Sequence, residues 1–152
     1  MAMVFFLLTI LLFFLLFALF SLSLGIILKK RGEAEEAEYL LSKAYIKRYN
    51  FILGISIHLN KEDADTLLSL REKAIKVEDI KSLKAINDNI SKQIDSLELQ
   101  EDDRNEAVEL KMDIDECVKE YNIAVDIFNR KVFGILNRFA AKVCKVCRME
   151  RL

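Results

Sequence analysis

Two cysteines, Cys144 and Cys147, form the pattern in this chain that comes nearest to a chemical site. Their Cys-x-x-Cys spacing occurs in zinc sites and in redox-active disulfides. A zinc site needs four ligands, and the chain offers only Cys117 and His58 in addition, both distant in sequence. A thioredoxin-like pair would need a strand before it, whereas these cysteines lie in a tail that we expect to be helical and basic. We interpret both as ordinary small side chains; a small redox- or metal-sensing protein using Cys144/Cys147 stays open as the alternative.

No other group of residues predicts catalysis. His58 is the single histidine, and we expect a surface or half-buried structural role for it. The many carboxylates between residues 101 and 126 are typical of the solvated face of a long helix. The sequence has no GxxxxGK, GxGxxG or HExxH motif and no nucleophile elbow. We therefore infer no enzyme, no catalytic residue, and no cofactor or metal site.

The chain begins with a long apolar run, Met3–Leu28, which contains no charged residue. As a helix it would be roughly 39 Å long, enough to cross a hydrocarbon core of about 30 Å with some tilt. A cleaved signal peptide is the alternative, but such peptides have a basic start and an apolar core of about 7–15 residues. Neither feature is present, and Ser21–Ser23 is only a weak mimic of a cleavage site. We interpret the run as an uncleaved transmembrane helix.

Lys29, Lys30 and Arg31 follow the run directly, and nothing basic precedes it except the amino terminus. Positive side chains beside a span are retained on the cytoplasmic side. We therefore predict a single-pass protein of the cell membrane, with the N-terminus outside and the C-terminal domain cytoplasmic. Residues 1–31 would be the anchor and residues 32–152 the cytosolic domain, with Gly32 as a flexible point between them. Three cysteines, an odd number, fit a reducing compartment.

Helix breakers are nearly absent, since the chain has no proline and only four glycines. This predicts an all-α fold, with the transmembrane helix followed by an antiparallel bundle of three to four long helices in coiled-coil-like packing. The net charge of −1 argues against nucleic acid as a partner. The charge is unevenly spread, with a net of −9 from Asp95 to Asp126 and +6 from Ile127 to Leu152.

Apolar spacing predicts a first helix over residues 33–59 and a second that begins after an Asn60 N-cap and runs to about Lys76. Residues 77–99 either continue the second helix or start a new one. The side chains expected to point inward are Ala37, Leu41, Ala44, Tyr45, Ile52, Ile55 and Leu59, then Ala64, Leu67, Leu68, Ala74 and Ile75, then Ile80, Leu83, Asn87, Ile90, Ile94 and Leu97.

Asn87 occupies a position of this pattern that is otherwise apolar. A single buried asparagine in such a seam often fixes the register of the helices at some cost in stability. The alternative is that Asn87 points to a solvated edge, and the sequence leaves both interpretations open.

A polar break at residues 100–105 precedes the last helix, whose apolar positions step by four and three. They are Ile114, Val118, Tyr121, Val125, Phe128, Val132, Ile135 and Phe139. So long a seam must pack on the earlier helices or on another copy of the chain. In the tail 131–151, one face carries Val132, Leu136, Phe139, Val143 and Val146 with basic residues beside it. That face either rests on anionic lipid or packs on the bundle, and we favour the bundle.

The segment Tyr121–Asn129, YNIAVDIFN, resembles the YNxxVxxYN motif of the LemA family, with Phe128 in place of the second tyrosine. Lys47–Ile52, KRYNFI, is similar to the family's RRYDLI segment, and anchor, basic-aromatic helix and YN motif come in the family's order. The proline and asparagine after RRYDLI, the FP step and the closing FGF of the family are absent. The resemblance implies an N-terminally anchored bundle of long helices. From the residues themselves, we expect Asn122 and Asn129 to determine packing by bonding a neighbouring helix.

Together these observations predict a single-pass, membrane-anchored helical interaction or scaffold protein of LemA-like type, without catalytic activity. Its expected partners are the lipid bilayer and a protein partner, or a second copy, that binds through helix faces.

Overall fold

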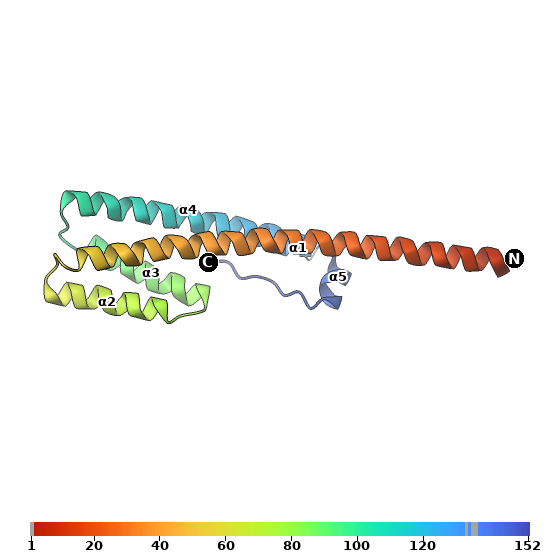
Figure 1. Cartoon of the computed structure of the whole chain (residues 1–152), viewed down its shortest axis with the longest axis horizontal. Helices are drawn as coiled ribbons and strands as arrows, with labels where there is room; N and C mark the ends of the chain where they lie inside the picture. Colours follow the sequence, from red (N-terminus) through yellow and green to blue (C-terminus); the bar gives the residue numbers. More distant parts are fainter. Residues whose placement is uncertain (1, 133, 135–136) are drawn as a thin grey trace. The chain divides into compact units, whose positions relative to one another are not determined.

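The computed structural model describes residues 2–132, 134 and 137–152, and over these residues the chain is all-α (Figure 1). The helices are α1 (Ala2–Ile55), α2 (Lys61–Ile75), α3 (Ile80–Asp95), α4 (Glu101–Val132) and α5 (Arg138–Val143). The predicted fold class is therefore confirmed. The contacts divide the chain into two compact units, Met1–Glu36 with Ile123–Glu150, and Ala37–Asn122 with Arg151–Leu152. We call these the first and the second unit and describe each by itself.

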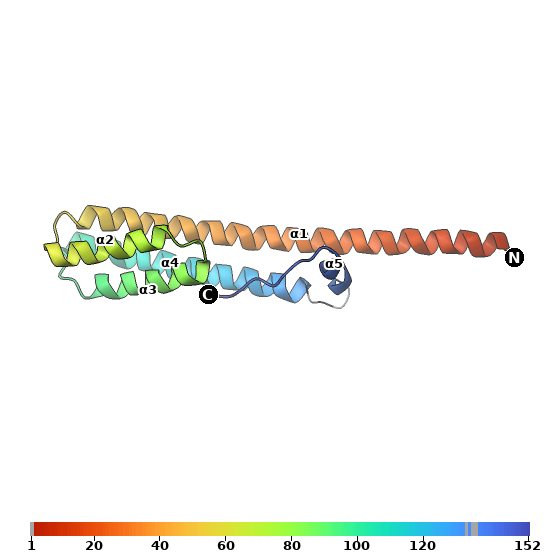
Figure 2. The same ribbon diagram turned by 90° about the horizontal axis from the view of Figure 1, so that it is seen from below.

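The second unit is an antiparallel bundle. The end of α1, then α2, α3 and the start of α4 run in alternating directions (Figures 1 and 2). The expected inward positions of α1 are buried at Leu41, Ala44, Tyr45, Ile52 and Ile55, because steps of three and four residues keep side chains on one helix face. Those of α3 are buried from Asn87 onward.

Local caps decide where α2 and α3 begin. Asn60 accepts a hydrogen bond at Oδ1 from the Asp63 N–H at 2.9 Å, so the predicted N-cap is confirmed. Asp79 accepts from the Ser82 N–H at 2.7 Å, so residues 77–79 connect two helices and α3 starts anew. The inward expectation for Ile75 is wrong, since its side chain is exposed in the last turn of α2.

The expected flexible point at Gly32 is wrong, because α1 runs through it without interruption. Glycine inside a helix costs about 1 kcal/mol relative to alanine. Two ion pairs bridge this position, Lys30 with Glu33 at 2.6 Å and Arg31 with Glu35 at 2.7 Å. Exposed pairs of this spacing contribute a few tenths of a kcal/mol each and offset much of that cost. The expected first helix, 33–59, is thus the second part of a longer helix that already ends at Ile55.

In the first unit, the end of α4 lies beside α1. Ile27 and Ala34 of α1 and Val125, Phe128 and Val132 of α4 are all buried. The predicted seam of the last helix is therefore confirmed as far as Val132.

Beyond Val132 the prediction of one continuous last helix is wrong. Asn137 Nδ2 donates to the Lys131 carbonyl oxygen at 2.9 Å and satisfies a terminal carbonyl of α4. A Cβ on Gly134 would lie 3.3 Å from that same oxygen, so the tight turn favours glycine. Phe139, expected in the seam, is 69% exposed, whereas Ile135 lies outside the described residues.

The expected amphipathic tail helix is also wrong. Within residues 137–152 only α5 is helical, and its buried side chains are Ala140 and Ala141. Val143, expected on the packed face, is exposed, and Leu136 lies outside the described residues. The irregular chain after α5 includes Lys145, whose φ of 52° is in the left-handed region.

Candidate functional site

The cysteine pair lies at the end of α5. Cys144 is the C-cap residue of this helix and Cys147 follows in irregular chain, so the expectation that both lie in a helical tail is wrong for Cys147. Both thiols are exposed. A helix precedes the motif, where a thioredoxin-like site would have a strand. Among the described residues, no group of three or more His, Cys, Asp or Glu is arranged to hold a metal ion.

Cys117 differs from this pair because it is half-buried on α4. Burial raises the pKa of its thiol, and the negative charges of Glu120, Asp113 and Glu116 raise it further. The reactive thiolate form is therefore disfavoured at Cys117.

His58 and most of the α4 carboxylates are exposed, as expected, whereas Asp103 and Asp126 are half-buried. His58 follows the end of α1, where its N–H donates to the Ile55 carbonyl at 2.9 Å and its side chain is exposed. Two carboxylates pair with lysines across the bundle, Asp95 with Lys111 at 2.7 Å and Asp113 with Lys47 at 3.6 Å.

A polar cluster joins α1 to α3 inside the second unit. Arg48, only 3% exposed, donates from Nη1 to the Asn87 carbonyl at 3.3 Å and to Ser91 Oγ at 2.8 Å. Asn87 is buried as well, so it lies in the seam and not at a solvated edge. Its Nδ2 donates to Tyr49 Oη at 2.8 Å and to the Leu83 carbonyl at 3.0 Å. Burial lowers the pKa of Arg48 and raises that of Tyr49. A buried cluster so connected favours one pairing of helices over slipped alternatives.

Tyr45, one turn before Tyr49, is buried but its hydroxyl has no hydrogen-bond partner among the described residues. Burial raises the pKa of Tyr45 far above its ordinary value, and the negative charge of Asp88 adds to the effect.

The two asparagines of the YN motif bind backbone. In the second unit, Asn122 donates from Nδ2 to the Leu152 carbonyl at 3.0 Å and accepts the Leu152 N–H at 2.8 Å. In the first unit, Asn129 makes the same pair of bonds with Met149, at 2.9 and 3.1 Å. The expected partner, a neighbouring helix, is therefore wrong, because each amide binds the backbone of the irregular chain after α5.

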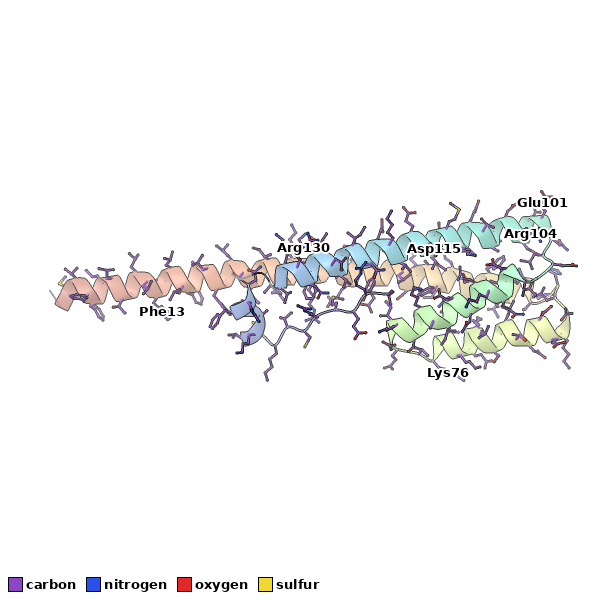
Figure 3. All side chains as sticks on the ribbon, turned by 180° about the vertical axis from the view of Figure 1, so that it is seen from behind. Phe13, Lys76, Glu101, Arg104, Asp115 and Arg130 are labelled. Carbon is purple, nitrogen blue, oxygen red and sulfur yellow. The ribbon has the colours of Figure 1, made fainter. Side chains whose placement is uncertain are left out.

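The start of α1, in the first unit, exposes an unusual surface. Its side chains from Met3 to Leu19 are exposed, although almost all are apolar. Figure 3 shows side chains projecting from α1 at Phe13, where no other drawn element lies beside the helix. By length and composition this helix is the described segment that could cross a membrane, with a mean hydropathy of 3.1 in its most apolar window.

In the first unit, α5 lies against this apolar helix at Phe20. The rings of Phe20 and Phe139 meet edge to face, with centroids 6.3 Å apart and planes 73° apart. A groove of about 580 Å³ lies here. Its lining residues are Leu16, Leu19, Phe20, Leu22, Ser23 and Ile26 from α1, with Asn137, Phe139 and Ala140 from α5.

Sequence reasoning missed this contact between α5 and α1. The available signal was local: Gly134 followed three residues later by Asn137 is a helix-ending pattern in an otherwise helical stretch. The sequence does not predict that α5 packs on α1, because Phe20 and Phe139 are distant in the chain.

Comparison with protein-family models, with curated proteins and with solved structures finds no match for this chain.

Proposed function

We propose that this chain is a single-pass, membrane-anchored helical interaction or scaffold protein. The observation that carries the proposal is the exposed apolar surface of α1 from Met3 to Leu19. Soluble proteins rarely expose a continuous apolar surface of this size, whereas lipid is the natural environment for one.

The distribution of charge supports a cytoplasmic side for everything after the anchor. The first unit contains nine Lys and Arg against five Asp and Glu, a net of +4, and the second unit a net of −5. Basic residues of α1, α4 and α5 therefore belong to the same unit as the apolar helix. Such residues favour the cytoplasmic leaflet, which is anionic.

An unpartnered helix face in the second unit supports the interaction role. Tyr39, Ile46 and Leu53 of α1 are seven residues apart and therefore share one face. All three are exposed. A stripe at this spacing is the kind of surface on which a further helix packs, from a partner protein or from a second copy. The LemA resemblance stays a proposal that rests on the quoted motifs alone.

Photo-crosslinking in native membranes tests the interaction role. A benzophenone side chain at Ile46 should give a defined adduct, while the same group at the exposed Glu72 of α2 should give none. Adducts at neither position, or equally at both, would argue against a specific helix-face interaction.

A further inference from the structure

The contact between Phe20 and Phe139 determines the position of α5 along the apolar helix. Phe20 precedes Leu28, the end of the apolar run, by eight residues, or about 12 Å of helix. Whatever packs on Phe20 therefore lies well inside the length of that run. Because an exposed loop of irregular chain is excluded from hydrocarbon, the run cannot all be buried in the bilayer core while α5 stays in water.

Burial along α1 resolves this conflict. Side chains from Met3 to Leu19 are exposed all around the helix. From Phe20 onward one face is covered, at Phe20, Ser23, Leu24 and Ile27, while Leu22, Ile26 and Leu28 stay exposed. The exposed stretch alone would be roughly 26 Å long, near the lower limit for a transmembrane helix. The edge of the hydrocarbon core then falls near Phe20, and α5 lies in the interfacial layer.

The side chains of α5 suit that layer. Phe139 and Val143 are one turn apart and exposed, while the alanines between them are the buried positions. Arg138 and Lys142 are likewise one turn apart and exposed. Apolar and basic side chains exposed together on this short helix match the acyl and phosphate parts of an anionic phospholipid.

We propose that α5 is an interfacial helix and that the groove between it and Leu16–Ile26 of α1 binds an acyl chain of an anionic phospholipid, whose phosphate lies near Arg138 and Lys142. The apolar lining of the groove and its continuity with the exposed apolar helix favour a lipid chain as the occupant. This inference rests on the proposed membrane anchorage, so its test has to separate the two.

Quenching of tryptophan fluorescence by brominated acyl chains makes that separation. The chain has no native tryptophan, so single variants of the full-length protein report one site each. The samples are vesicles of phosphatidylcholine and phosphatidylglycerol with bromine near the headgroup end of the chains. Phe13→Trp reports the anchor and Phe139→Trp reports α5. Tyr39→Trp, roughly 28 Å beyond Phe20 along α1, reports a site in water.

We expect quenching at positions 13 and 139 and none at 39. Quenching at 13 with none at 139 would overturn the interfacial placement of α5 and leave the anchorage intact. An unquenched tryptophan at 13 would overturn the anchorage itself. Val143→Trp, on the same face of α5 as Phe139, repeats the measurement should the substitution at 139 disturb the contact with Phe20.

Lipid retained by the detergent-purified protein tests the headgroup assignment. The double variant Arg138→Gln, Lys142→Gln should retain less phosphatidylglycerol by native mass spectrometry, by about fivefold for each charge removed. The control Lys73→Gln, Lys76→Gln makes the same change of charge at the end of α2 and at its C-cap residue, and it should retain as much as the wild type. Equal retention by both double variants would overturn the role of Arg138 and Lys142.

Discussion

At the scale of single residues, two buried tyrosines on neighbouring turns of α1 differ in what their hydroxyls bind. The Tyr49 hydroxyl accepts a hydrogen bond from Asn87, whereas that of Tyr45 has no partner among the described residues. A buried hydroxyl without a partner costs free energy, while a satisfied one contributes about 1 kcal/mol. The two phenylalanine substitutions should therefore have opposite effects on stability.

We predict that Tyr45→Phe raises the free energy of unfolding by about 1 kcal/mol and that Tyr49→Phe lowers it by a similar amount.

High pH gives a second test, because the pKa of Tyr45 is higher in the folded state than in the unfolded chain. The un-ionised Tyr45 hydroxyl therefore makes its full contribution to the free energy of unfolding below about pH 10. That contribution is lost as the pH rises toward the pKa of Tyr45 in the folded state. Tyr45→Phe should accordingly lose less stability above pH 10. Chemical unfolding at pH 7 and pH 11 measures both effects, and a destabilised Tyr45→Phe would contradict the assignment.

The three cysteines should differ in reactivity. Alkylation needs the thiolate, which burial and the neighbouring carboxylates disfavour at Cys117, while Cys144 and Cys147 are exposed. We predict that iodoacetamide modifies Cys117 several-fold more slowly at pH 8 and that its rate continues to rise at higher pH. Peptide mass spectrometry over time gives each rate. In guanidinium chloride the three rates should converge, and equal rates in the folded protein would refute the prediction.

At the scale of elements, α4 carries two asparagines whose spacing matches the segment they hold. Seven residues of helix advance about 10.5 Å, and three residues of extended chain about 10 Å. Asn122 and Asn129 are seven apart, and their partners Leu152 and Met149 are three apart. Because both amides bind backbone atoms, the identity of the side chains at 149 and 152 does not enter these hydrogen bonds.

Substitutions at Asn129 test this arrangement. Asn129→Ala removes both hydrogen bonds to Met149, so the backbone amide hydrogen of Met149 should exchange with solvent about tenfold faster. Asn129→Asp keeps an oxygen for the Met149 N–H but loses the donor to its carbonyl, so it should give an intermediate rate. Met149→Ala should leave exchange near the wild-type rate. NMR of the full chain in detergent measures these rates, and an unchanged rate in Asn129→Ala would show that other contacts hold the segment.

Whether the sequence predicts an element depends on how far apart in the chain the residues lie whose contact determines that element. The Asn60 cap and the α4 seam up to Val132 follow from residues within a turn or two, and both were predictable. The flexible point expected at Gly32 is absent because the flanking ion pairs help to sustain the helix there. The break after Val132 has a local signal in Gly134 and Asn137. The groove beside α5 depends instead on the contact of Phe139 with Phe20, two residues far apart in the chain that helical periodicity does not bring together.

At the scale of the whole molecule, the two compact units carry opposite net charges, +4 for the first unit and −5 for the second. Positive charge within about 15–20 residues of a span is what sets orientation during insertion. Lys29, Lys30 and Arg31 meet that condition, whereas the basic residues of α4 and α5 join the same unit only after folding. The first three should therefore decide the topology.

We predict that Cys144 and Cys147, both exposed, react with a membrane-impermeant maleimide only after the cell membrane is permeabilised. Replacing Lys29, Lys30 and Arg31 together by glutamine should make a fraction of the molecules reactive in intact cells, because the retained positive charge beside the span is lost. The same three-charge change at Lys61 and Lys73 of α2 and at its C-cap residue Lys76 should leave labelling as in the wild type. Labelling of the wild type in intact cells would place the bundle outside and overturn the orientation, while leaving the anchorage of α1 intact.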